Sequence, residues 1–310
     1  MKILITGCSG FIGSNLCEKL IELNNFIVYG IDIQELPLDF KYKYKNKIIF
    51  MKEDINTPEL LSIKNIKPDL VIHLAALAGV SESCITPQKY VDININGTIN
   101  LIENCIKNNI KKIIYASSSS IYGNTDNIDI YNTTCELQSP YSITKKCCEM
   151  LFDYYNRFYN LDLVGLRFFS VYGPRCRKDM APYIFINSII NDKIITINGD
   201  GNIIRDFTYI DDIIDGIILS IDFINQNDGK HEIFNLGNGN PITINEFIEK
   251  IENILNKKIK IIYGVSKKHD NLKTCADLKK SFEKINYKPK IDINTGLKLT
   301  IDYLLKSCTD

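Results

Sequence analysis

The chain has 310 residues, enough for two lobes around a large core. Its 37 lysines and arginines balance its 37 aspartates and glutamates, so charge gives no reason to expect a nucleic-acid or membrane-surface partner. Ten scattered cysteines and only three histidines argue against a disulfide framework and against a metal site. No apolar run approaches the ~20 residues that span a bilayer, and no signal-peptide pattern opens the chain, so we expect a cytoplasmic protein.

Strand-like and helix-like segments alternate over the first half of the chain. The expected strands cover 2–6, 26–31, 48–51, 70–74, 112–117 and 162–168. The expected helices cover 11–24, 87–108 and 141–160. Such alternation predicts an α/β fold with a doubly wound parallel sheet of the Rossmann type.

The pattern changes after Gly173. Short elements are expected around 194–197, 232–236, 243–255, 259–262, 277–284 and 294–305, with a helical stretch at 207–224. We therefore predict a first, Rossmann domain made of residues 1–168 and about 205–228. Residues 169–204 and 229–310 are predicted to form a smaller mixed α/β lobe.

A glycine loop follows the first expected strand. Gly7, Gly10 and Gly13 recur every three residues at the start of a helix, where backbone amides can cradle a pyrophosphate. Asp32 ends the next strand, and no arginine follows it in the next three positions, so we expect a ribose 2′-hydroxyl there and favour NAD over NADP. Further cofactor contacts are predicted at Phe11, Ile12, Asp54, Ile55, Ala75 and Ala76.

A tyrosine and a lysine lie one helical turn apart in the segment YSITK. Tyr141 and Lys145 share a helix face, and an ammonium group stabilises a phenolate, so this phenol can act as a general base. Ser118 ends the preceding strand, where an open parallel sheet presents its ligand site. We predict that these three residues oxidise a substrate alcohol together with the dinucleotide. His73 lies in a buried-looking strand and is interpreted as a core residue.

The chain resembles the extended short-chain dehydrogenase/reductase family, in particular its nucleotide-sugar 4-epimerases. The resemblance rests on TGCSGFIG (6–13), HLAALAGV (73–80), NINGT (94–98), SSSSIYG (117–123), PYSITK (140–145), LRFFSVYGPRCRKDMA (166–181), RDFTYIDD (205–212) and FNLGNGNP (234–241). It implies NAD as the cofactor, with Asn94 among its contacts, and it assigns Ser118 to the catalytic set of Tyr141 and Lys145.

The two residues after Ser118 separate the reactions of this family. Its sugar 4,6-dehydratases resemble one another in carrying Asp-Glu there, and its decarboxylases typically carry a glutamate in the second position. This chain has Ser119 and Ser120 instead. The resemblance therefore implies oxidation at C4 without elimination, followed by return of the hydride to the other face of the sugar.

The segment 166–181 is most similar to UDP-glucuronate 4-epimerases, which share FFTVYGP followed by RPDMA. The resemblance implies that Ser170 and Arg177 lie near the C5 substituent, and a hydroxyl with a guanidinium suits a carboxylate. The chain departs from this pattern at Ser170, which replaces threonine, and at Lys178, which replaces proline. The remaining substrate contacts that the resemblance implies are Ser119, Ser120, Arg205, Lys267 and Asp270.

We therefore expect an NAD-dependent nucleotide-sugar 4-epimerase, with UDP-glucuronate as the first choice of substrate. Epimerisation of UDP-glucose or UDP-N-acetylglucosamine, decarboxylation and 4,6-dehydration stay open as alternatives, as does a binding protein without turnover. The two predicted lobes then become an NAD-binding domain and a nucleotide-sugar-binding lobe. Related enzymes pair the helices that correspond to 87–108 and 141–160 in a four-helix bundle, so we also expect a homodimer.

Overall fold

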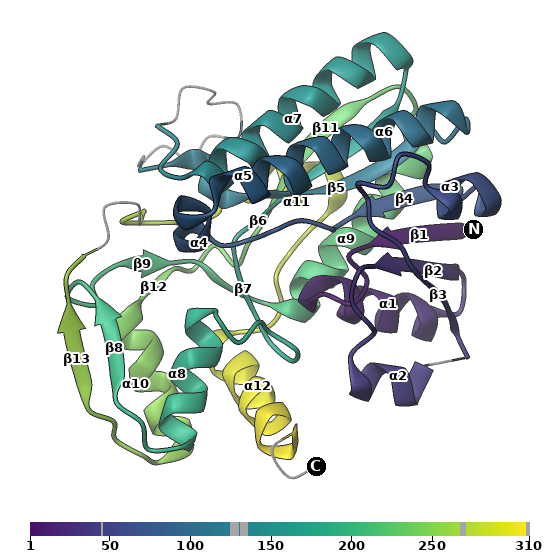
Figure 1. Cartoon of the computed structure of the whole chain (residues 1–310). Helices are drawn as coiled ribbons and strands as arrows, with labels where there is room; N and C mark the ends of the chain where they lie inside the picture. Colours follow the sequence, from purple (N-terminus) through teal and green to yellow (C-terminus); the bar gives the residue numbers. More distant parts are fainter. Residues whose placement is uncertain (45, 125–129, 131–135, 267–270, 308–310) are drawn as a thin grey trace.

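The computed structural model describes residues 1–44, 46–124, 130, 136–266 and 271–307 (Figure 1). Seven parallel strands form the main sheet, in the order β11-β6-β5-β4-β1-β2-β3. They are β1 (Lys2–Thr6), β2 (Ile27–Asp32), β3 (Ile48–Lys52), β4 (Leu70–His73), β5 (Lys112–Ser118), β6 (Asp162–Phe168) and β11 (His231–Leu236). The strand order reverses between β1 and β4, which is the doubly wound Rossmann arrangement that the sequence predicts.

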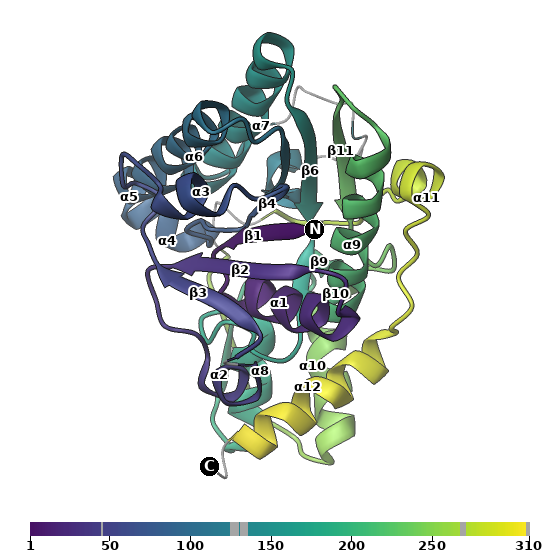
Figure 2. The same ribbon diagram turned by 90° about the vertical axis from the view of Figure 1, so that its right-hand side faces the viewer.

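Helices cover both faces of the sheet (Figures 1 and 2). One face carries α3 (Leu61–Ile66), α5 (Pro87–Tyr90), the π-helical segment Val91–Asn96, α6 (Gly97–Lys107) and α7 (Pro140–Tyr159). The other carries α1 (Phe11–Leu23), α9 (Ile210–Gln226) and α11 (Lys279–Ile285). Short helices α2 (Leu38–Tyr44) and α4 (Val80–Ile85) and the 3₁₀ turn Ser119–Tyr122 lie at the edges.

Within the described residues, the smaller lobe contains three two-stranded sheets and three helices. The strands are β7 (Ser170–Tyr172), β8 (Ile195–Asn198), β9 (Ile204–Arg205), β10 (Phe207–Tyr209), β12 (Ile242–Thr243) and β13 (Ile261–Gly264). The helices are α8 (Ala181–Ile190), α10 (Ile244–Leu255) and α12 (Ile293–Ser307), with α10 packed against the other two. In the part of the chain that the structure describes, no helix is long and apolar enough to cross a membrane.

The observed packing differs from the predicted domain division at β11 and α11, and also at β10, which lies in the predicted 205–228 segment but pairs with β7 of the smaller lobe. The prediction placed residues 229–310 in the smaller lobe, but β11 pairs in parallel with β6 and completes the main sheet. The helix α11 packs on β11 and α9, so it also belongs with the first domain. The element itself was predicted at 232–236, but its apolar pattern carries no information on which strand it will pair with.

A buried ion pair joins α7 to strand β6 of the main sheet. Arg167 on β6 donates from Nε and Nη2 to the two carboxylate oxygens of Glu149 on α7, at 2.8 and 2.9 Å, and both side chains are 3% exposed. The Ser117 hydroxyl donates to the same carboxylate at 2.7 Å. Burial alone would raise the pKa of Glu149, but hydrogen bonds and the charge of Arg167 lower it below its usual value. The pair is therefore ionised at neutral pH.

Replacing one residue of this pair should destabilise the fold, because the charge of the other stays buried without a partner. We expect Arg167→Met to lower the free energy of unfolding by about 3–5 kcal/mol, because it leaves the Glu149 carboxylate without its main countercharge. Urea titration followed by circular dichroism measures this. The double variant Glu149→Leu with Arg167→Met removes both charges and should recover most of the loss. A double variant as unstable as the single one would contradict this account of the pair.

Candidate active site

The glycine loop between β1 and α1 has the shape of a phosphate cradle. Gly7 adopts φ +72°, and a Cβ there would lie 2.7 Å from the Ala75 backbone nitrogen, which explains the glycine. A Cβ at Gly13 would collide with the Gly7 carbonyl oxygen. No described side chain caps the N-terminus of α1. The residues of its first turn line a cavity beside the loop, which fits the pyrophosphate of a dinucleotide.

Ser118 lies at the carboxyl end of β5, in register with Phe168 on β6. It is extended, with φ −153°, and its hydroxyl oxygen accepts a hydrogen bond from the Ser120 amide at 3.2 Å. This cap starts the 3₁₀ turn Ser119–Tyr122 and turns the chain away from the sheet edge. The structure thereby holds the Ser118 side chain at the sheet edge where parallel sheets bind ligands.

A capping box fixes the helix turn that carries Tyr141. The Ser139 hydroxyl accepts from the Ser142 amide at 3.2 Å, and the Ser139 amide donates to the Ser142 hydroxyl at 3.1 Å. One turn further along α7, Lys145 is 5% exposed and its Nζ donates to the Ala116 carbonyl at 2.9 Å. The helix thus presents the phenol and the ammonium beside the end of β5.

Two cavities meet at these residues. The first, here the glycine-loop cavity, is lined in part by Gly7, Gly10, Gly13, Ala76, Ala116 and Lys145. The second, here the serine cavity, is lined in part by Ser119, Ser120, Ser139, Ser170, Arg205 and Thr274. Their shared wall includes Ser118, Tyr141, Phe168, Phe169, Arg177 and Met180. A molecule in one cavity can therefore react with a molecule in the other beside the Tyr141 phenol.

The serine cavity has the polarity of a site for an anion. None of the described residues that line it is an aspartate or glutamate, whereas Arg177 and Arg205 both are part of its lining. The Ser120 hydroxyl is buried without a partner among the described atoms. A buried orphan hydroxyl is costly, so a ligand that bonds it is favoured.

Arg177 connects the two lobes across this cavity. Its Nη2 donates to the Ala78 carbonyl at 2.8 Å, in the loop that follows β4. Its Nε and Nη2 donate to the two carboxylate oxygens of Asp179 at 3.0 and 2.5 Å. Asp179 is mostly exposed, at 65%, so water screens it and a buried ligand anion can share the guanidinium.

Several predicted cofactor residues lie outside both cavities. Asp32 accepts from the amides of Ser9 and Gln34 at 3.0 and 2.9 Å, and so holds the glycine loop against β2. Asp54 is exposed and accepts from the Asn56 amide at 2.9 Å. The Ile55 side chain is 5% exposed and packs in the core.

The polar atoms of the Asn94 side chain form hydrogen bonds within the protein. Its side chain donates to the Leu77 carbonyl and the Thr144 hydroxyl at 3.0 Å each, and accepts from the Leu77 amide at 2.8 Å. The backbone carbonyl of Asn94, which lies in the π-helical segment, accepts a hydrogen bond from the Cys148 thiol on α7. Asn94 therefore ties the loop after β4 to α7. The Ala75 amide donates to the Thr6 hydroxyl at 3.1 Å, and Ala76 lines the glycine-loop cavity.

Lys267 and Asp270 lie outside the described residues. Sequence reasoning missed the lining residues Gln138, Phe168, Phe169, Met180, Asn271 and Thr274. Phe168 ends β6 as Ser118 ends β5, and Phe169 comes next, so the same rule for strand ends would have found both phenylalanines. Asn271 and Thr274 come from a distant part of the chain, and no local pattern indicates them.

His73 is a core histidine, as the sequence suggests. It is 5% exposed, and its two ring nitrogens bond the hydroxyls of Thr6 and Thr98 at 2.8 and 3.0 Å. Burial lowers the pKa of His73 to about 3, and the charge of Lys145 acts in the same direction. His73 therefore stays neutral. Among the described residues, no group of three or more His, Cys, Asp or Glu side chains could hold a metal ion.

The fold and the site together define an enzyme that binds a dinucleotide and changes a substrate alcohol. The chain belongs to the NAD dependent epimerase/dehydratase family, whose model matches residues 3–237. This membership confirms the predicted family and the predicted dependence on NAD.

Relatives of known name cover almost the whole chain. It is 39% identical to a UDP-glucuronate 4-epimerase of Thermodesulfobacterium geofontis, over 97% of this chain and 95% of that protein. A UDP-glucuronic acid 4-epimerase from Bacillus cereus, solved with UDP-glucuronic acid and NAD, is 34% identical with a TM-score of 0.92, over 99% and 100% of the two chains. A UDP-glucose 4-epimerase of Thermotoga maritima, solved with UDP-glucose, is 31% identical with a TM-score of 0.88, over 99% and 100%.

The neutral state of His73 should make the protein less stable in mild acid. The unfolded chain binds a proton at this residue below about pH 6.5, and the folded chain does not, so stability falls as the pH decreases. Between pH 7 and pH 5 the residue should remove ~2 kcal/mol of unfolding free energy. Urea titrations at both pH values measure this loss. His73→Asn cannot titrate, so its loss should be smaller by that amount; an equal loss would contradict the assignment.

Proposed function

We propose that this protein is an NAD-dependent UDP-sugar 4-epimerase that interconverts UDP-glucuronate and UDP-galacturonate. The observation that carries the proposal is the composition of the serine cavity. Among its described lining residues, it offers two arginines and several hydroxyls to a ligand and no carboxylate. UDP-glucuronate carries a diphosphate and a sugar carboxylate, which such a surface can bind. The names and ligands of the related proteins from T. geofontis and B. cereus support this choice.

In this proposal Tyr141, Ser118 and Lys145 are the catalytic residues. Tyr141 takes the proton of the C4 hydroxyl, and Ser118 donates a hydrogen bond to the same oxygen. Lys145 holds the phenolate by its charge and has donors beyond the one that bonds Ala116 for a cofactor ribose. When bound, NAD accepts the C4 hydride and later supplies it. The 4-keto sugar turns over in the serine cavity, so that the hydride returns to the opposite face of C4 while Tyr141 gives its proton back to the C4 oxygen.

The residues around the C5 substituent determine which product forms from the 4-keto sugar. Ser119 and Ser120 provide hydroxyls where elimination would need an acid and a base, so water is not lost. A 4-keto glucuronate is a β-keto acid, which can lose carbon dioxide. We propose that Arg177, Ser170 and the orphan hydroxyl of Ser120 bind its carboxylate and hold it in a rotamer that keeps the carbon–carbon bond.

The remaining contacts extend along the two cavities. Gly7, Gly10, Phe11, Ile12 and Gly13 line the first cavity and are proposed to bind the pyrophosphate of NAD. Asp32 is proposed to bind the adenosine ribose from the end of β2. Arg205 is proposed to meet the diphosphate of the sugar nucleotide. The proposed contacts of Lys267 and Asp270 rest on the sequence alone.

We also propose a homodimer through α7 and its neighbour α6. A stripe of large apolar side chains on α7 faces solvent, with Ile143, Met150, Tyr154 and Phe158 between 44% and 67% exposed. Successive members of the stripe are seven, four and four residues apart, which places them on one face of the helix. Static light scattering should give twice the chain mass, and Phe158→Asp should return it to the mass of one chain. A monomer before the substitution would contradict the proposal.

The proposed reaction is tested by incubating the protein with UDP-glucuronate and NAD and resolving the products by anion-exchange chromatography. We expect UDP-galacturonate and no UDP-pentose. Tyr141→Phe removes the proton acceptor, so it should reduce turnover by at least about 10³-fold while NAD still binds, measured by isothermal titration. Thr144→Ser on the same helix turn serves as the control and should remain active. Conversion of only neutral UDP-sugars would contradict the proposal for the carboxylate site.

A further inference from the structure

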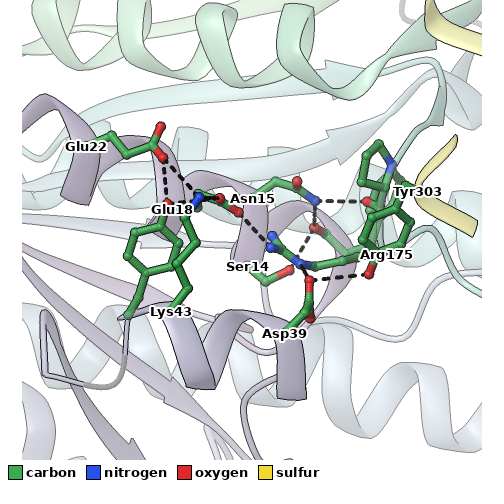
Figure 3. Close-up of polar contacts among 11 residues, drawn as sticks. Ser14, Asn15, Glu18, Glu22, Asp39, Lys43, Arg175 and Tyr303 are labelled. Carbon is green, nitrogen blue, oxygen red and sulfur yellow. Dashed lines mark hydrogen bonds and ion pairs between the residues drawn. The ribbon is translucent and has the colours of Figure 1, made fainter. Parts of the chain in front are cut away.

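The loop between β7 and α8 carries a second arginine, which the proposed reaction does not use. Arg175 lies two residues before Arg177, but its side chain extends toward α1 and α2 of the first domain (Figure 3). Its Nη2 donates to Glu18 on α1 at 2.7 Å, and its Nε donates to Asp39 on α2 at 2.7 Å. The Arg175 side chain is only 11% exposed. One guanidinium thus bridges two helices of the first domain.

The backbone of this loop is held on the same side. Asn15 on α1 donates from its amide to the Pro174 carbonyl at 3.1 Å. The same amide donates to the Phe11 carbonyl at 2.8 Å, at the first turn of α1. Arg175 has φ +63°, a conformation that residues other than glycine rarely adopt. Such a conformation persists only where surrounding contacts fix it, and it often marks a functional segment.

The ion pairs of Arg175 are part of a larger cluster and are stable at neutral pH. Glu18 also accepts from Lys43 and from the Tyr44 hydroxyl, both at 3.0 Å. Burial alone would raise the pKa of Glu18, but the hydrogen bonds from Lys43 and Arg175 lower it. The Tyr303 hydroxyl on α12 donates to Asp39 at 3.3 Å. The cluster therefore keeps its charges and joins α1, α2 and α12 around the arginine, as Figure 3 shows.

Arg175 and Arg177 hold the loop from opposite directions. Arg175 fastens it to α1, whose first turn lines the glycine-loop cavity. Arg177 reaches across to the Ala78 carbonyl and forms part of the wall that both cavities share. A two-residue span leaves little freedom between the two guanidinium groups, so the attachment of the first limits the position of the second.

We propose that Arg175 is a positioning residue. It fixes Arg177 at the distance from α1 that binding of a sugar carboxylate requires. It thereby sets the preference of the enzyme for an acidic over a neutral UDP-sugar. This inference rests on the proposed function, because the carboxylate is the group that Arg177 is proposed to bind. Arg175 itself touches neither cavity wall, so its effect must pass through the loop.

A double-mutant cycle between the two arginines tests the inference. The readouts are kcat and KM for UDP-glucuronate and the inhibition constant of UDP-glucose, which requires no turnover of the neutral sugar. Arg177→Met should raise the KM for UDP-glucuronate about 100-fold with little change in UDP-glucose inhibition. Arg175→Met should raise the same KM about tenfold and leave kcat within about twofold. In the Arg177→Met background it should add less than about twofold, because the two residues act through one contact.

Two controls separate positioning from a general loss of structure. Lys64→Met breaks an exposed ion pair with Glu59 and should leave all three constants unchanged. Hydrogen-exchange mass spectrometry of Arg175→Met should show faster exchange in residues 173–180, with the main sheet unaffected. If Arg175→Met is too unstable to assay, Asp39→Ala removes one contact of the guanidinium and replaces it in the cycle.

The outcomes distinguish this inference from the proposed function. Equal KM losses from Arg175→Met in both backgrounds would overturn the positioning role while leaving the carboxylate site intact. Unchanged exchange in residues 173–180 would overturn it as well. If Arg177→Met leaves the KM for UDP-glucuronate unchanged, the proposed carboxylate site fails, and the inference that rests on it fails too.

Discussion

The buried pair of Glu149 and Arg167 is the contact on which the geometry of the active site depends. Tyr141, Lys145 and Glu149 follow one another at intervals of four on α7, so they share the face that packs on the sheet. Arg167 binds Glu149 through both carboxylate oxygens, and Ser117 adds a third bond beside Ser118. The bidentate geometry fixes both the rotation and the height of α7 over the strand ends. The Tyr141 phenol and the Ser118 hydroxyl, which come from different elements, are thereby both held at the junction of the two cavities.

The chain between β6 and α8 connects the strand that carries Arg167 to the residues that line the serine cavity. Phe168 and Phe169 lie at the junction of the two cavities, and Ser170 starts the first strand of the smaller lobe. A few residues later Arg175 and Arg177 point to opposite sides of the same loop. The segment is thus attached to the sheet at one end and to α1 and α2 at the other. Substrate specificity in this account depends on how rigid that attachment is.

The sequence predicts the core of this structure well, because local patterns determine it. Its local signals include apolar strands such as 70–73, the glycine loop and the spacing of Tyr141 and Lys145, each contained in a short stretch of sequence. Pairing between distant segments is not local: β11 joins the main sheet through contacts with β6, and Thr274 enters the serine cavity from far along the chain. Asn94 was predicted as a cofactor contact, yet its amide is used by Leu77 and Thr144. Asparagine is equally suited to both uses, so only packing distinguishes them.

The central claim is that C4 is oxidised and reduced again within one active site while the carboxylate is retained. The direct measurement uses UDP-glucuronate with deuterium at C4 and mass spectrometry of the purified product. The account predicts UDP-galacturonate that keeps the deuterium, because the hydride that leaves C4 returns to the same carbon. A product without deuterium, or a UDP-pentose that has lost carbon dioxide, would contradict it.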